Sequence, residues 1–313
     1  MAIDHIIIRA YQTGDEQVVI ALFEQVFNQI ITPAQWQWKY KGTGTAGVHS
    51  QLVFDAENRL LGHAGAIPLR GYLQGKPIPF FQICDVMVHP TARGHLGPRN
   101  LFTTLLRRLL GVIASKHPEA FCYGFPGRRP FLLGERVRVY DKIEFAVELT
   151  RQPRLLTFPL LRVRRLDWSN PALDQLWARL LPWNALLLAR DGAYLRWRYA
   201  QNPVHRYTLL GFFGLGRLLG WAVTRRSDER LLIVDLLCKR SWLGLILRAL
   251  DQVAATTGAQ TVHIWLPEDW RAGGSGDQHV TEVVVSNMLG QLPLATSLVK
   301  DSLYYTMGDL DIF

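Results

Sequence analysis

The spacing of apolar residues divides the chain into short strands and amphipathic helices in alternating order. Residues 3–10 and 51–55 are typical of strands, and residues 60–73 return from the second of these across a polar turn. Residues 14–29 carry apolar side chains at helical spacing, and Pro33 opens another helix in the first-turn position that proline tolerates. This pattern predicts a layered α/β (α+β) fold.

The most informative pattern is a strand, a basic loop and a helix in residues 82–110. Apolar residues fill the strand except at Asp85, and Pro90 ends it. Apolar residues at helical spacing resume at Leu101. Because free backbone N–H groups and the positive end of a helix dipole meet at such a loop, we expect it to bind a phosphate or pyrophosphate. The loop residues concerned are Arg93, Gly94, His95, Gly97 and Arg99.

The chain also contains an internal repeat. Three short motifs of the first half return in the same order in the second half, which predicts two copies of one domain. In the last of them Asp85 matches Asp235. The repeated segments are 38–40 (WKY) with 197–199 (WRY), 60–64 (LLGHA) with 218–222 (LLGWA), and 83–86 (ICDV) with 233–236 (IVDL).

The two copies differ at the loop. After Asp235 the chain runs through residues 238–244 directly into a helical pattern, and no glycine-rich loop intervenes. We therefore expect the first copy to bind the phosphate-bearing ligand. The second copy is expected to be a degenerate partner that covers the first sheet and shapes a pocket for the other substrate.

Composition limits the classes of protein less sharply. The chain has 313 residues, of which 49% are hydrophobic, and a net charge of +9 that suits an anionic ligand or nucleic acid. No apolar run approaches the roughly 18 residues of a membrane span, and the first residues lack the apolar core of a signal peptide. Its three cysteines form no C-x-x-C pair and its histidines show no metal-ligand spacing. We expect a cytoplasmic protein without a metal.

The strand 85–90 (DVMVHP), the loop that opens with Arg93-Gly94-His95 and the following amphipathic helix resemble the GNAT superfamily of acyl-CoA-dependent N-acetyltransferases. With its repeat, the chain is similar to the tandem acetyltransferases of the enhanced-intracellular-survival (Eis-like) type. The resemblance implies a GNAT domain over 1–150, a basic linker over 151–165 and a degenerate GNAT-like domain over 166–313. Each domain would have a mixed, mostly antiparallel sheet flanked by helices.

The same resemblance implies acetyl-CoA as co-substrate, bound along the strand and by the loop. Backbone N–H groups at Met87 or Val88 would stabilise the oxyanion. The loop departs from the family pattern R-x-x-G-x-G/A, because Leu96 and Pro98 stand where two small residues are expected. Either Gly94 and Gly97 act in a shifted loop, or the loop carries an insertion.

Acyl transfer also needs groups that move protons. The resemblance of residues 140–145 to a family signature implies that Tyr140, on a helix after the next strand, protonates the thiolate that leaves. Candidates for the general base are Asp85, His89 and the terminal carboxylate of Phe313. Asp85 has an alternative interpretation, as a structural carboxylate paired with a helix terminus or an arginine.

Three functions remain open from the sequence. The first is an N-acetyltransferase that joins acetyl-CoA and a small amine-bearing acceptor by direct attack, without nucleic acid or membrane as partner. The second is a tRNA-dependent aminoacyl transferase of the peptidoglycan-bridge type, and the third is a catalytically inactive GNAT-fold binding protein. The acceptor and the oligomeric state are not determined by the residues.

Overall fold

The chain is described by a computed structural model over residues 6–43, 47–94, 100–155, 161–181, 185–271, 274–290 and 293–311. It folds into two compact units that both draw on separate stretches of sequence. The first unit comprises Met1–Gly71, Pro77–Glu144 and Val283–Asp301, and the second comprises Tyr72–Lys76, Phe145–Glu282 and Ser302–Phe313. No helix among the described residues is long and apolar enough to cross a membrane.

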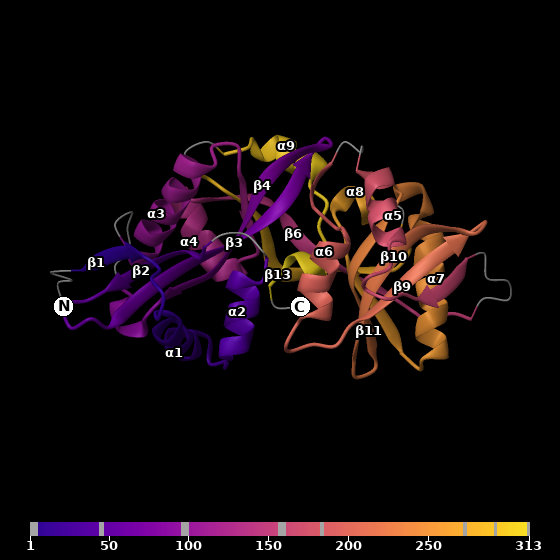
Figure 1. Ribbon diagram of the computed structural model, residues 1–313, viewed down its shortest axis with the longest axis horizontal. Coiled ribbons are helices and arrows are strands. Elements are labelled where there is room, and N and C mark those ends of the chain that lie inside the picture. Colours follow the sequence, from indigo (N-terminus) through magenta and orange to yellow (C-terminus); the bar gives the residue numbers. More distant parts are fainter. Residues whose placement is uncertain are drawn as a thin grey trace. The chain divides into compact units, whose positions relative to one another are not determined.

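The first unit is a mixed sheet with helices on it, and Figure 1 shows α3 and α4 above strands β1 and β2 and α1 below them. The strands follow the order β1-β2-β3-β4-β5-β13-β6, in which β4 and β5 are parallel. They are β1 (Ile7–Ala10), β2 (His49–Phe54), β3 (Leu60–Leu73), β4 (Lys76–Val88), β5 (Phe121–Gly124), the first part of β6 (Tyr140–Arg151) and the last part of β13 (Asp277–Met288). The helices are α1 (Glu16–Phe27), α2 (Pro33–Lys41), η1 (Pro90–Ala92), α3 (Leu101–Lys116), α4 (Arg128–Arg136) and α9 (Thr296–Ser302).

Local sequence explains where the two helices that border the site begin. Helix α2 starts with a capping box, in which the Thr32 hydroxyl accepts from the Gln35 N–H and the Gln35 side chain accepts from the Thr32 N–H. Pro33 occupies the first turn, as predicted. Helix α3 is capped by the Asn100 side chain and buries one apolar face. That face comprises Leu101, Leu105, Leu106, Leu109, Leu110 and Ile113.

The second unit repeats this plan. Its strands follow the order β6-β12-β11-β10-β9-β7, and β11 and β12 are parallel. They are β7 (Arg162–Arg165), β9 (Thr208–Gly214), β10 (Arg217–Ser227), β11 (Arg230–Cys238) and β12 (Thr261–Trp265), with the rest of β6. The unit also contains β8 (Leu186–Leu188), which lies off this path, and the rest of β13. The helices are α5 (Ala172–Leu180), α6 (Gly192–Leu195), the π-helix η2 (Arg196–Ala200), η3 (Arg240–Trp242), α7 (Leu243–Thr256), α8 (Glu268–Arg271) and η4 (Met307–Asp309).

In each unit a W-[KR]-Y segment in a helix precedes an antiparallel hairpin, an Asp-bearing strand, a helix and a parallel strand. The prediction of an α/β fold with mixed, mostly antiparallel sheets flanked by helices is therefore confirmed. The second copy also lacks a separate loop, because η3 runs into α7 without an intervening residue.

Part of the segment expected to be a basic linker is strand: Arg151 ends β6, and Arg162–Arg165 form β7, which pairs with β9. The two units are also not divided at a single point in the sequence, since β3, β4, β6 and β13 each have residues in both. Val283–Asp301, which the sequence placed in a second domain over 166–313, lies in the first unit.

Candidate functional site

The parallel strands β4 and β5 separate halfway along β4. Their ladder runs from Phe80 opposite Phe121 to Ile83 opposite Gly124, the last pair that the described residues record. Strand β4 then continues to Val88, while β5 ends at Gly124 and pairs on its other side with Ser286 of β13. The β5-facing edge of β4 beyond Ile83 therefore has backbone groups outside this ladder. An extended ligand can bind such an edge as an added strand would.

A bulge-like distortion begins at the same place. Asp85 has a backbone φ of 47°, in the left-handed region that residues other than glycine rarely adopt. Such a conformation within a strand costs on the order of 1–3 kcal/mol and redirects the peptide groups that follow. The surrounding structure must hold Asp85 in place for it to persist.

The Asp85 carboxylate is held by two residues of helix α2. Lys39 Nζ lies 2.7 Å from one oxygen, and the Tyr40 hydroxyl donates to the other at 2.5 Å. The side chains of Lys39 and Asp85 are each only 7% exposed. Burial, with the nearby Asp85 charge as the next cause, raises the pKa of Tyr40, so its hydroxyl stays protonated and acts as the donor.

The backbone carbonyl of Asp85 is held from the other side, by His63 of β3. Its Nδ1 lies 2.8 Å from the carbonyl oxygen, and its Nε2 lies 3.1 Å from the Ser50 hydroxyl. Burial lowers the pKa of His63, so the ring is neutral at neutral pH. Because the carbonyl can only accept, the proton is on Nδ1, and Nε2 accepts from Ser50.

Asp85 is therefore a paired carboxylate, but its partners are a lysine and a tyrosine rather than a helix terminus or an arginine. In the sequence, Lys39 and Tyr40 stand out only as part of the repeat, 46 and 45 positions away from Asp85. The signal was present, since a W-[KR]-Y segment precedes an Asp-bearing strand in both copies.

The end of β4 leads into the loop expected to bind a pyrophosphate. The buried Met87 and half-buried Val88 lie beyond the ladder with β5, as the predicted oxyanion role requires. Arg93 is exposed, and its Nε donates to the Val88 carbonyl at 2.9 Å. Gly94 has a φ of 113°, which favours glycine. The predicted site residues His95, Gly97, Arg99 and Phe313 lie outside the described residues.

Tyr140 was expected on a helix, but this prediction is wrong, because Tyr140 is the first residue of the strand β6. Its ring lies 5.9 Å from that of Phe102 and 6.3 Å from that of Phe131, and it packs so closely on Gly134 that a methyl group there would overlap it. Burial raises its pKa, so the hydroxyl is protonated at neutral pH.

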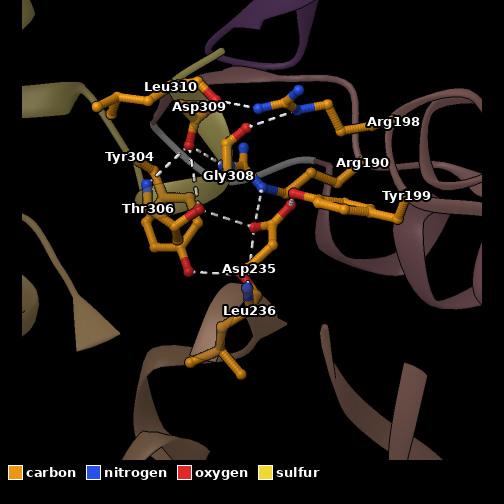
Figure 2. Close-up of polar contacts among 10 residues, drawn as sticks. All are labelled: Arg190, Arg198, Tyr199, Asp235, Leu236, Tyr304, Thr306, Gly308, Asp309 and Leu310. Carbon is orange, nitrogen blue, oxygen red and sulfur yellow. Dashed lines mark hydrogen bonds and ion pairs between the residues drawn. The ribbon is translucent and has the colours of Figure 1, made fainter. Parts of the chain in front are cut away.

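The second unit has the same carboxylate in a different setting. Asp235 accepts from the Tyr199 hydroxyl at 2.8 Å, from Arg190 Nε at 2.9 Å and from the Thr306 hydroxyl at 3.0 Å, as Figure 2 shows. Arg190 also pairs with Asp309 at 2.5 Å. Asp235 is not among the described residues with a positive φ. All these side chains are nearly or wholly buried.

The segment that follows α9 covers the edge of β11 in this second unit. The ladder between β11 and β12 ends at Ile233 opposite Ile264, two residues before Asp235, as it does before Asp85. Beyond it, the Tyr304 hydroxyl donates to the Leu236 carbonyl at 2.6 Å. The Tyr304 ring lies 4.6 Å from that of Trp270, in the helix after β12. In the second unit, therefore, the segment after α9 lies at the edge of β11. This edge corresponds to the edge of β4 in the first unit that lies beyond the end of β5.

This segment is anchored by buried polar contacts that sequence analysis missed. Arg198 donates to the carbonyls of Gly308 and Leu310, the first at 3.0 Å. The Thr306 N–H donates to Asp309 at 2.7 Å. Nothing in the local sequence of 304–310 marks it as a partner of Asp235, because it lies outside the repeated motifs.

These features match a known family. The sequence of residues 7–142 matches the family model described as acetyltransferase (GNAT) domain. Residues 7–142 are thus similar to a GNAT acetyltransferase domain over less than half of the chain. The matched segment is the one that bears the site. It contains the separation of β4 from β5, Asp85 and its partners, and the start of the loop. A search of curated proteins finds no match to the chain.

Solved structures share the fold over most of the chain. A probable N-acyltransferase from Enterococcus faecalis V583, itself described as a conserved protein of unknown function, has a TM-score of 0.69 at 14% identity, covering 92% of this chain and 73% of that one. A GCN5-related N-acetyltransferase from Kribbella flavida has a TM-score of 0.66 at 17% identity, with 92% and 72% covered. Another GCN5-related N-acetyltransferase, from Anabaena variabilis ATCC 29413, has a TM-score of 0.65 at 13% identity, covering 90% of this chain and 72% of that one. At these identities the likeness shows the fold alone.

The lowered pKa of His63 predicts a pH-dependent stability of the first unit. Below about pH 6.5 the unfolded chain gains a proton at this residue that the folded chain resists, so stability is lost as the pH falls. We expect the melting temperature to fall less between about pH 7 and about pH 5 in a His63→Gln variant than in the parent. The exposed His279, changed to Gln, is the control and should keep the parent's slope. Equal slopes in all three proteins would contradict the assignment.

Proposed function

We propose that this protein is an acyl-CoA-dependent N-acyltransferase that transfers an acetyl group from acetyl-CoA to a primary amine by direct attack. The observation that carries the proposal is the edge of β4 beyond Ile83, which lies outside the ladder with β5 that the described residues record and begins beside the left-handed Asp85. It lies within the matched acetyltransferase domain. That edge offers backbone groups to an extended pantetheine arm, and the bulge redirects the peptide groups of Met87 and Val88.

In this mechanism the amine attacks the thioester carbonyl carbon, and negative charge develops on its oxygen. An N–H of Met87 or Val88 donates to that oxygen in the tetrahedral intermediate. The C–S bond then breaks and coenzyme A leaves as a thiolate, which takes a proton from Tyr140. The amine's proton passes to a base, for which Asp85, His89 and the terminal carboxylate of Phe313 are the candidates.

The loop after β4 completes the proposed cofactor site. Arg93 and the backbone of residues 94–99 bind the pyrophosphate, and Arg93 is already fixed to the end of β4 through the Val88 carbonyl. The first unit binds the cofactor alone, because in the second unit Tyr304 and Thr306 occupy the corresponding edge and no separate loop precedes α7.

Acetyl-CoA should stabilise the protein. A ligand supplied at about a hundred times its dissociation constant adds roughly 2.7 kcal/mol to the free energy of unfolding, which thermal denaturation detects. Turnover with a panel of primary amines then separates an enzyme from an inactive binding protein. If acetyl-CoA at about 1 mM leaves the melting temperature unchanged, the proposal is ruled out and the tRNA-dependent alternative is favoured.

An Arg93→Ala variant should bind acetyl-CoA more weakly by about 1–3 kcal/mol, because a charge-assisted contact to the pyrophosphate is lost. Calorimetric titration measures the loss. Arg240→Ala is the matched control: Arg240 begins η3 at the corresponding place in the second unit and donates to the Asp269 carbonyl. Similar losses in the two variants would mean that the roles of the two units are wrongly assigned.

A Tyr140→Phe variant removes the proposed acid while keeping the ring that packs on Gly134. We expect turnover to fall roughly 10²-fold, because proton delivery to the thiolate is lost, with acetyl-CoA affinity close to the parent's. Steady-state kinetics and titration measure the two effects. Parent-like turnover with a lowered melting temperature would instead assign Tyr140 to packing.

A further inference from the structure

The left-handed residue in β4 is held by a set of buried contacts that have no evident use except to fix its conformation. Lys39 and Tyr40 hold the Asp85 carboxylate from α2, and His63 holds its carbonyl from β3. Three residues from two elements thus constrain Asp85 at both its side chain and its backbone. The carbonyl contact matters most here, because the orientation of a peptide group determines where the next N–H points.

The strand on either side of this residue is anchored as well. Before it, Ile83 is paired with Gly124 of β5, and after it the His89 N–H donates to the Leu61 carbonyl at 2.8 Å. The intervening peptide groups include those of Met87 and Val88. Their directions therefore depend on the conformation that Asp85 takes between the two fixed points.

The second unit shows that the tyrosine–carboxylate hydrogen bond does not by itself require a left-handed residue. Tyr199 and Asp235 make the same bond, at 2.8 Å against 2.5 Å for Tyr40 and Asp85, yet of the two aspartates only Asp85 has a positive φ. In the second unit the ladder of β10 and β11 shifts register between Val223 and Thr224, opposite Asp235 and Ile233. There the carboxylate holds Thr306 and Arg190 in place.

We propose that Lys39 and Tyr40 are positioning residues for acyl transfer, which hold Asp85 in its left-handed conformation and thereby direct the N–H of Met87 or Val88 toward the thioester carbonyl oxygen. This inference rests on the proposed function. It means that Asp85 acts as a positioning residue and not as the general base. Both carboxylate oxygens already accept hydrogen bonds, and a proton taken from the amine would disrupt the ion pair with Lys39.

The first test compares two matched substitutions. Tyr40→Phe and Tyr199→Phe each remove one buried hydroxyl bonded to the equivalent carboxylate, so both should lower the melting temperature. Only Tyr40→Phe should also lower kcat, by about tenfold or more, since small displacements of a catalytic group cost large factors in rate. The dissociation constant for acetyl-CoA should change less than kcat, because the N–H acts mainly in the transition state. Equal kcat in Tyr40→Phe and the parent would overturn the inference.

The second test separates positioning from proton transfer at Asp85. Asparagine tolerates the left-handed conformation and keeps a side-chain oxygen that can accept from Lys39, but it cannot accept a proton. Asp85→Asn should therefore keep kcat within about tenfold of the parent, with the pH dependence of kcat/KM unmoved. A loss beyond about 10³-fold together with the disappearance of a limb of that pH profile would identify Asp85 as the base and overturn the positioning role.

The third test uses rescue at Lys39. Lys39→Met removes the ion-pair partner and should lower kcat, whereas Lys39→Arg keeps the charge and should restore most of it. Circular dichroism and the melting temperature show whether each variant is folded, and Lys39→Arg remains informative if Lys39→Met is not. A Lys39→Arg variant as slow as a folded Lys39→Met one would contradict the inference.

Failure of the proposed function and failure of this inference give different results. If the parent neither binds acetyl-CoA nor turns over, the proposed function fails and this inference fails with it. If the parent is active and the Tyr40→Phe variant is equally active, the inference alone fails.

Discussion

A carboxylate in the middle of a buried strand must be paired, because its desolvation is otherwise too costly for a marginally stable fold. Both units contain one, and each recruits the polar groups of its neighbourhood. Asp85 binds Lys39 and Tyr40, while Asp235 binds Tyr199, Arg190 and Thr306. Since the partners come from helices and loops outside the strand, each carboxylate ties its strand to the layer that covers the sheet.

The same device has different consequences in the two units. In the first, the strain of a left-handed aspartate is maintained beside an open strand edge, which is the state expected where backbone groups must meet a ligand. In the second, the carboxylate anchors a segment of the chain that occupies the corresponding edge, and Asp235 needs no unusual φ. The two units of similar plan thus differ at this edge: in the first it lies outside the recorded ladder with β5, and in the second a segment of the chain contacts it.

Periodicity and motif order allowed much of this to be predicted. The apolar spacing in residues 101–110 correctly predicted the buried face of α3, and the repeated motifs predicted two units of similar plan. The basic run Arg162–Arg165, which the sequence placed in a linker, forms a strand, because an edge strand needs only backbone pairing and tolerates charged side chains. Tyr140 was misplaced because α4 ends at Arg136, before the signature begins.

Other features were beyond the reach of local sequence. The left-handed φ of Asp85 occurs without a glycine, and it results from contacts with residues 22 to 46 positions away. The partners of Asp235 include Thr306, which is 71 residues distant and has no counterpart in the repeat. Such long-range pairing of polar groups follows from the tertiary structure and leaves no periodic pattern in the chain.

The way the two units share sequence has a consequence for how the molecule is made. Residues 283–301 complete the first unit, and residues 302–310 supply Thr306 and Asp309 to the buried charges of the second. During synthesis from the N-terminus, therefore, neither unit can reach its final packing until these residues have left the ribosome. Until then Arg190 lacks Asp309 as its partner and Asp235 lacks Thr306.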